Sequence, residues 1–270
     1  CFDFDTRANL LNLDVRDDWA DDVKALHLRN RQQLVDELGA EFGTWHAEQK
    51  AQNFLDLGAK PFSVVAYHNN FFDQARRAFV VGAYYPALTA TCALGERVLN
   101  QLVLTLRGEF LATPEYQQVY RQRSFTNWKL MIDTLTAWGI LRADAAFREL
   151  AGVRHRAVHF NPATDTNDRP LALESLKLMT GIIQTQFSAF GTMPWSMADV
   201  PGEVYIAKAH ESAPFVRHVY LPNCEHVGLR HVIQSFGPGG RMEVRDKHTY
   251  EERELSDAEF CSLRQKGQGG

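Results

Sequence analysis

The sequence of 270 residues lacks any run of 18 or more apolar residues, so no segment is long enough to span a membrane as a helix. It also lacks the basic segment followed by a short apolar one that is typical of a secretory signal peptide. Its four cysteines lie far apart and form no C-x-x-C pair, so the sequence indicates no disulfide framework. We therefore expect a cytoplasmic protein with reduced thiols and no membrane partner.

Several signatures of catalytic sites are also missing. No glycine-rich phosphate loop, Ser-His-Asp arrangement or carboxylate cluster for magnesium stands out. A zinc site near Cys224, His226, His218 and His231 is conceivable, but the usual paired spacings are absent, and ordinary strand and turn residues are the favoured interpretation. We expect no metal and no other cofactor.

What the chain does contain is typical of a globular protein with a sizeable core. Hydrophobic residues make up 45% and charged residues 23%, and the formal net charge of -4 argues against a protein-wide cationic surface for nucleic acid. A local site can still be basic, because a ligand meets only the local field. The chain begins at Cys1 rather than Met, so we expect a trimmed or incomplete product.

The first part of the chain, residues 1–68, predicts an N-terminal helical extension. Residues 17–39 open with aspartates, which favour a helix start, and close on Gly39. A shorter helix at 45–57 is stopped by Gly58 and Pro61. The first of these helices has an apolar stripe, formed by Trp19, Val23, Leu26, Leu34 and Leu38.

The central part, residues 69–192, carries the strongest helical periodicity. Pro86 is expected to kink or restart the first helix, because proline has no N–H and disfavours a helical residue before it. Moderate connections between four helices favour an antiparallel, up-and-down bundle. The four predicted helices are 69–110, 127–139, 143–160 and 170–190, with Gly191 just past the last.

The last part, residues 193–270, predicts a small strand-rich C-terminal appendage. Short, roughly alternating, β-branched segments separated by turn residues indicate strands. A terminal helix begins at Ser256, with Glu259 three residues later as a capping box. The predicted strands lie within residues 203–209, 215–221, 227–236 and 241–250. The fold class is thus mainly α, with this appendage at one end.

The stretch ELAGVRHRAVHFNP, residues 149–162, places two arginines and two histidines at the end of the third predicted bundle helix. On a helical wheel Arg154 falls in the middle of the apolar stripe. His155 and His159 are four residues apart and share one flank, whereas Arg156 points to solvent. Three residues, Arg154, His155 and His159, therefore converge at the margin of the core.

An arginine followed by a polar residue and then a histidine, near the end of the third helix of a four-helix bundle, resembles the R-x4-6-H motif of the HEPN domain. Here Arg154-His155-x-x-x-His159 fits that pattern. The resemblance covers roughly residues 70–191 and implies an HEPN-like bundle with metal-independent endoribonuclease activity, as in toxin–antitoxin and antiviral defence systems.

The resemblance also implies roles for these residues. His159 would be the general acid or base, Arg154 would bind phosphate and stabilise the transition state, and His155 would orient or supplement them. HEPN sites usually form where two copies meet, which implies a homodimer through the bundle, an RNA substrate and a regulatory or antitoxin partner. Some HEPN toxins carry a tyrosine two residues after the histidine that a nucleotidyltransferase modifies, but this position is Asn161 here.

Two non-catalytic interpretations remain open. Arg154 can be a structural arginine that pairs with a buried carboxylate, for which Glu96, at the edge of its own helix's apolar stripe, is the candidate. Cations near a helix C-terminus are favoured by the helix dipole without any catalytic role. Without catalysis, the chain can be an HEPN-like interaction module that joins partners, or a bundle that binds a nucleotide phosphate at the same cationic seam.

Overall fold

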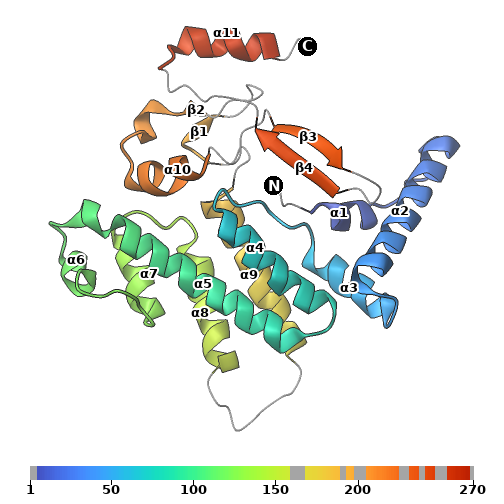
Figure 1. Ribbon diagram of the computed structural model, residues 1–270, viewed down its shortest axis with the longest axis horizontal. Coiled ribbons are helices and arrows are strands. Elements are labelled where there is room, and N and C mark those ends of the chain that lie inside the picture. The colour runs from blue at the N-terminus through green and yellow to red at the C-terminus, as the bar shows by residue number, and fades with distance from the viewer. Residues whose placement is uncertain are drawn as a thin grey trace.

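A computed structural model describes residues 5–158, 168–188, 193–197, 205–224, 231–236, 241–246 and 254–267 of the chain. The molecule is mainly helical, as predicted, and the few strands are short (Figure 1). None of the helices in these ranges is both long and apolar enough to cross a lipid bilayer. The longer helices are α2 (Asp21–Phe42), α3 (Ala47–Leu57), α4 (Ala66–Val80), α5 (Tyr84–Leu106), α7 (Trp128–Ala137), α8 (Asp144–Val158), α9 (Arg169–Gln186) and α11 (Asp257–Gly267).

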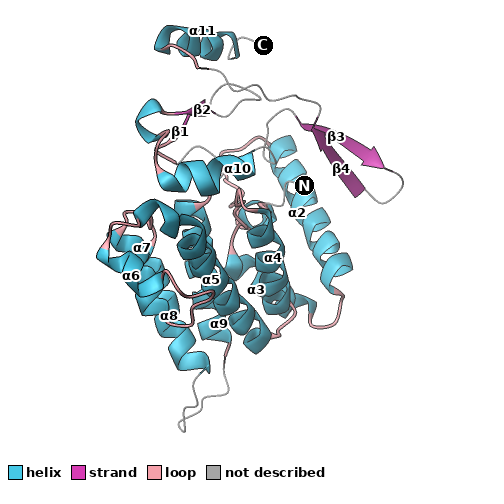
Figure 2. Ribbon diagram, turned by 60° about the vertical axis from the view of Figure 1, so that its left-hand side comes forward, coloured by secondary structure: helices cyan, strands magenta, loops and turns pink. Residues whose placement is uncertain are grey.

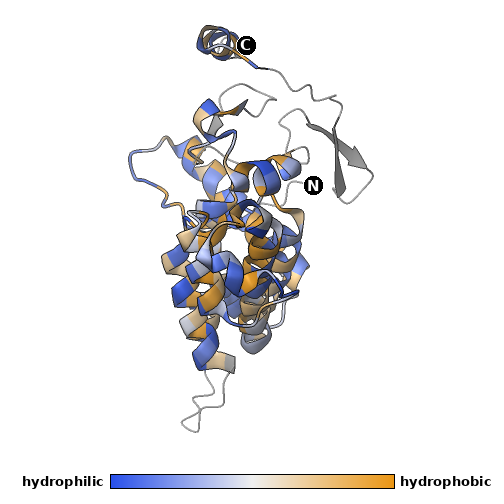
Figure 3. Ribbon diagram, turned by 90° about the vertical axis from the view of Figure 1, so that its left-hand side faces the viewer, coloured by the Kyte–Doolittle hydropathy of each residue, from blue (hydrophilic) through white to orange (hydrophobic). Residues whose placement is uncertain are grey.

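The centre of the fold is α5, which packs against α4, α7, α8 and α9 (Figure 2). Helix α9 in turn contacts α4 and α8, which closes the bundle. Figure 3 shows the hydrophobic residues, in orange, gathered where these helices face one another. The one predicted helix at 69–110 is two, because the chain turns at Gly82, whose φ is 87°, before α5 begins. Pro86 lies in the first turn of α5, where its missing N–H costs no hydrogen bond, so the predicted restart is confirmed.

The short elements connect or flank these helices. Helix α1 (Arg7–Leu11) precedes α2, and η1 (Arg107–Phe110) and α6 (Pro114–Val119) join α5 to α7. The other short helical segments are η2 (Lys208–His210), η3 (Val216–Tyr220) and α10 (Leu221–Cys224). Two antiparallel pairs make up the strands: β1 (Ser196–Met197) with β2 (Tyr205–Ile206), and β3 (His231–Phe236) with β4 (Arg241–Asp246).

The predicted end of the first long helix was wrong by one turn. Helix α2 passes through Gly39 and ends after Phe42, and Gly43 takes the positive φ of 80° at its C-cap. Helix α3 ends at Gly58, as predicted, with a φ of 65°. A glycine marks a helix end only where the chain must adopt a positive φ, and Gly39 does not adopt one.

The predicted strand at 215–221 was also wrong, because this segment is helical. Val216–Tyr220 forms a single π-helical turn and Leu221–Cys224 continues it as α10. The buried side chains are Phe215, Val216, Val219 and Tyr220, a spacing of one, three and one residues that fits a helix rather than a strand. Two other predicted strand segments contain β3 and β4, and a third contains β2.

The parts of the chain outside the bundle share its hydrophobic core. Phe54 and Leu57 of α3 and Phe215 and Tyr220 near η3 belong to the same cluster of buried residues as α5 and α9. The domain boundaries at 68 and 192 therefore stay predictions. At the far end, the predicted capping box is confirmed: the Ser256 backbone N–H donates to Glu259 at 2.8 Å, and the Glu259 N–H donates to the Ser256 hydroxyl at 3.3 Å.

Helices α3 and α4 each donate a side-chain hydrogen bond to backbone carbonyls at the C-terminal end of the other. The Asn53 amide of α3 is fully buried and donates to the carbonyls of Phe79 and Val80, at 3.1 and 3.2 Å. The Arg76 guanidinium of α4 donates in return to the carbonyl of Gly58, at 2.6 Å. The last carbonyls of a helix have no partner within it, so each helix here supplies what the other lacks.

A buried polar cluster starts α4. The Asn69 side chain accepts from the Ser63 N–H and donates to the Ser63 carbonyl, both at 2.8 Å. The Ser63 hydroxyl lies 2.9 Å from Nδ1 of His68 and accepts from the N–H of Val65. His68 packs edge-on against Phe187, and its burial lowers the pKa of the imidazole to about 3. The ring is therefore neutral throughout the physiological range.

This burial predicts a pH dependence of stability. The unfolded chain protonates His68 near its ordinary pKa of about 6.5, whereas the folded chain does not until about pH 3. The stability contribution of neutral His68 is present above pH 6.5 and is lost as the pH falls toward 3. We expect His68→Gln to remove this pH-dependent contribution. The free energy of unfolding of the wild type, measured in urea, should then exceed that of the variant by an amount that shrinks by about 1.4 kcal/mol per pH unit below pH 6. An advantage that stays constant with pH would contradict the assignment.

Candidate functional site

The end of α8 brings two of the three predicted catalytic residues to the surface. Arg154 is partly exposed and His155 is exposed, while His159 lies outside the described residues. Arg156 points to solvent, as predicted, and Nη2 of its side chain pairs with Glu174 of α9 at 2.9 Å. Positive charges in the last turn of a helix also compensate its dipole, so they stabilise α8 in any case.

Arg154 forms the predicted ion pair with Glu96 of α5. Its Nη2 lies 3.3 Å from Oε2 of the carboxylate. The two side chains keep 28% and 31% of their surface exposed, so the pair is neither buried nor fully solvated. A guanidinium carries five N–H donors in a planar fork, and this contact engages one of its nitrogens. Donors thus remain for an anion that approaches from the open side.

The pair is held by Trp128, a role that the sequence did not indicate. Its indole Nε1 donates to the same Glu96 oxygen at 2.9 Å. The Arg154 guanidinium lies over the indole ring, 5.6 Å from its centroid. Asn127 caps α7 by accepting from the N–H of Leu130, so Trp128 is the first residue of the helix and its position is fixed. Three helices, α5, α7 and α8, therefore position one guanidinium.

The indole reaches Glu96 because α5 has no side chain at Gly95. A Cβ built on Gly95 would lie 2.6 Å from Cη2 of Trp128 and 3.0 Å from Cδ2 of Leu150. The first of these distances is far below van der Waals contact. Gly95 is thus a packing residue for α7 and α8, and the position of Trp128 depends on it.

The predicted position of Arg154 on its helix needs a correction. It lies at the edge of the buried stripe of α8, not in the middle. The stripe is centred on Leu150 and Val153, both fully buried, and the sequence interpretation overlooked Val153. An edge position costs a charged side chain far less desolvation than a central one.

Cys92, one turn before Glu96 on α5, is not poised as a nucleophile. Burial raises the pKa of its thiol to about 11, although the positive charge of Arg154 acts in the opposite direction. The thiolate is the reactive form, and it is scarce at neutral pH with such a pKa. Cys92 therefore packs in the core.

The described residues do not bring the weak zinc pattern together as a group of ligands. Cys224 closes the short helix α10 rather than lying on a strand, and burial raises the pKa of its thiol to about 12. His218 pairs with Glu109 at 2.9 Å, while His226 lies outside the described residues. In the ranges that the structure describes, no three His, Cys, Asp or Glu side chains are grouped so that they could hold a metal ion.

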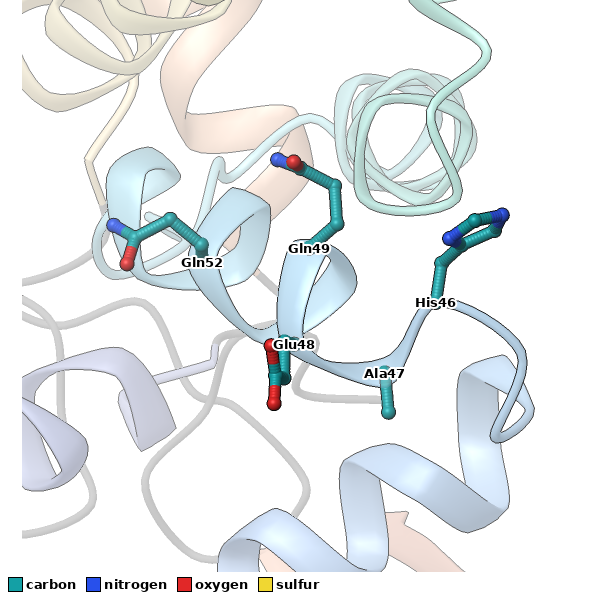
Figure 4. A pocket seen from close by; sticks show the side chains of 5 residues that line it. All are labelled: His46, Ala47, Glu48, Gln49 and Gln52. Atoms are coloured by element: carbon teal, nitrogen blue, oxygen red, sulfur yellow. The ribbon is translucent and has the colours of Figure 1, made fainter.

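A hollow of about 650 Å³ lies at the N-terminal end of α3 (Figure 4). None of the predicted site residues lines it. Its lining is formed by His46, Ala47, Glu48, Gln49 and Gln52. The hollow is wide open to solvent, and its lining combines one imidazole and one carboxylate with two amides, none of which belongs to the predicted site.

Comparison of this chain with models of protein families, with curated proteins and with solved structures finds no match in any of the three. The residues at the end of α8, with the motif that they form, are therefore the basis for a functional assignment.

The close approach at Gly95 predicts a measurable cost. We expect Gly95→Ala to lower the free energy of unfolding by about 1–3 kcal/mol, because the added methyl group overlaps the rigid indole of Trp128. Gly181→Ala in α9 is the matched control, since its Cβ meets no atom within 4 Å. It should stabilise the protein by up to about 1 kcal/mol through helix propensity. Urea unfolding measures both changes, and equal effects would contradict the packing role of Gly95.

Proposed function

We propose that this chain is a metal-independent endoribonuclease of the HEPN type, with an active site formed by Arg154, His155 and His159. The observation that carries the proposal is the placement of Arg154. It is the arginine of the R-x4-6-H motif, and it stays partly exposed while Glu96 and Trp128 fix its position. An arginine with only a structural role needs a carboxylate partner, but its guanidinium does not need to stay accessible to solvent.

The proposed chemistry is the attack of a ribose 2′-oxygen on the adjacent phosphorus. One imidazole accepts the 2′-hydroxyl proton while the 2′-O–P bond forms, and a protonated group donates to the 5′-oxygen while the P–O5′ bond breaks. The products are a 2′,3′-cyclic phosphate and a 5′-hydroxyl, and no redox partner or metal is required. His159 is assigned as the general acid or base, with His155 as the group that orients or supplements it.

Arg154 is assigned to the phosphate. Negative charge builds up on the non-bridging oxygens in the transition state, and a fixed guanidinium can donate to two of them at once. Glu96 is a supporting residue that holds the guanidinium rather than touching the RNA. The donation from Trp128 to Glu96 keeps this carboxylate from swinging away, which preserves the orientation of Arg154.

The proposal includes a setting and partners. Two copies would meet at the bundle, so that Arg154 and the histidines of both face one cleft, as in other composite sites. The enzyme would act in the cytoplasm, in bacterial defence or a toxin–antitoxin stress response, and a regulatory or antitoxin partner would restrain it.

A second candidate is a non-catalytic, HEPN-like bundle that binds a nucleotide or a protein partner. The cations near the site favour it, because Arg154, Arg156 and Arg148 each pair with a carboxylate of the chain. A net charge of -4 also gives little general attraction for RNA. In this case the guanidinium binds phosphate but no bond is broken.

RNA cleavage in EDTA tests the proposal. We expect the wild type to cleave labelled RNA without metal and leave a 2′,3′-cyclic phosphate. His159→Ala should slow the reaction by about 10²–10⁴-fold, because it removes proton transfer. Arg154→Gln should slow it by about 10²–10³-fold, because it removes charge stabilisation. Arg156→Gln is the matched control on the same helix turn, and it should change the rate little.

Binding measurements separate the two candidates. If the wild type binds a nucleotide and Arg154→Gln abolishes the binding, yet no RNA is cleaved, the non-catalytic bundle is supported and the nuclease is wrong. If the wild type cleaves RNA and His159→Ala does so equally, the assigned acid or base is wrong. Circular dichroism of each variant checks that the bundle is still folded.

A further inference from the structure

Helix α2 carries an apolar stripe that the rest of the described chain covers only at one end. Of the predicted stripe residues, Trp19 lies in the turn before α2 begins at Asp21. Among the four on the helix, Val23, Leu26, Leu34 and Leu38, only Leu38 is buried, with 5% of its surface exposed. Leu26 is 50% exposed and Val23 is 38% exposed. Figure 1 shows the first half of α2, in dark blue, extending away from α3 and α4.

The covered end is firmly attached. Glu41 pairs with Arg7 at 2.9 Å and with Arg77 at 2.6 Å, and the Lys50 ammonium donates to the Phe42 carbonyl at 2.7 Å. Phe42 also lies against the ring of Phe54. The C-terminal half of α2 thus fixes the direction of the helix, and the N-terminal half is presented as a rigid, half-apolar surface. A helix exposing such a stripe is typical of an interaction surface.

Charges of alternating sign run along one flank of this stripe. Asp22, Arg29 and Asp36 are seven residues apart, so they lie on the same side of the helix, next to Leu26. In the described part of the chain neither Asp22 nor Arg29 has an ion-pair partner, and both are exposed. The stripe and its charged flank resemble half of a coiled-coil seam.

We propose that the occupant of this surface is the α2 helix of a second copy of the chain, packed antiparallel. In an antiparallel pair the same flanks of the two helices meet, and Asp22 of one copy then faces Arg29 of the other. The two-fold symmetry forms this ion pair twice. In the same register Val23 of each copy packs against Leu26 of the other, which covers the two most exposed side chains of the stripe.

The charges select this arrangement over a parallel one. In a parallel pair opposite flanks meet, so Asp22 would face His27 and Arg29 would face Leu34, and the complementary pair would be lost. The seam is short, and small interfaces are weak and transient. The association is therefore expected to depend on protein concentration. It involves a surface far along the chain from Arg154 and does not depend on the proposed nuclease activity.

Light scattering and sedimentation of the full chain test this inference. We expect the molar mass to rise with concentration in the micromolar range, and Leu26→Glu to halve it at the highest concentration. Leu28→Glu is the matched control, because Leu28 is equally exposed, at 56%, but lies nearly opposite Leu26 on the helix. If the bundle also pairs two copies, Leu26→Glu leaves that pair intact and still halves the larger mass.

A charge swap tests the antiparallel register. Asp22→Arg and Arg29→Asp each place like charges together at two symmetric positions, so each should raise the dissociation constant by about tenfold. The double variant Asp22→Arg/Arg29→Asp restores opposite charges and should return the constant to the wild-type value. Both residues are exposed, so these changes leave the core intact. Asp22 lies in the first turn of α2, where an arginine opposes the helix dipole, so circular dichroism of each variant checks the helix content.

Three outcomes would overturn the inference. The first is a mass that stays constant over the whole concentration range. The second is a mass that falls equally with Leu26→Glu and Leu28→Glu. The third is a double charge variant that associates as weakly as the single ones, because only the antiparallel pairing of residues 22 and 29 predicts the rescue.

Discussion

The packing of an indole against a bare stretch of backbone determines how the centre of this protein is arranged. Because Gly95 has no side chain, Trp128 lies directly on α5, and Leu150 of α8 fits beside it. The same indole presents its N–H to Glu96, which lies next to Gly95 in the chain. The close contact of α5, α7 and α8 and the orientation of Arg154 are thus two results of a single contact.

Local signals predicted much of the fold. Gly58 ends α3, Pro86 lies in the first turn of α5, and Ser256 with Glu259 caps α11, and each of these acts on backbone groups within four residues. A reader of the sequence can identify such residues because their partners are close in the chain. The failures arose where the deciding partner is distant. Gly39 has the identity of a helix stop, but Gly43 performs that function.

The segment at 215–221 is a second case in which contacts with distant parts of the chain decide the local structure. From the sequence alone, its apolar residues fit both the two-residue period of a strand and the 3.6-residue period of a helix. Phe215, Val219 and Leu221 lie on one face of a strand, whereas Val216 and Tyr220 do not. The burial of Phe215, Val216, Val219 and Tyr220 against the bundle selects the helical period. At the candidate site, the Arg154–Glu96 pair could be predicted, because both residues lie at the margins of apolar stripes. The contribution of Trp128 could not be, because it depends on the absence of an atom at Gly95, 33 positions earlier.

The exchange of hydrogen bonds between α3 and α4 has a consequence for the cooperativity of folding. Asn53 completes the end of α4, and Arg76 completes the end of α3. Each helix thus receives on its final carbonyls donors that the other helix carries, so the C-terminal turns of the two helices stabilise each other. This couples the region before residue 68 to the bundle in a single cooperative unit, whose amide hydrogens should exchange with solvent in one common opening event.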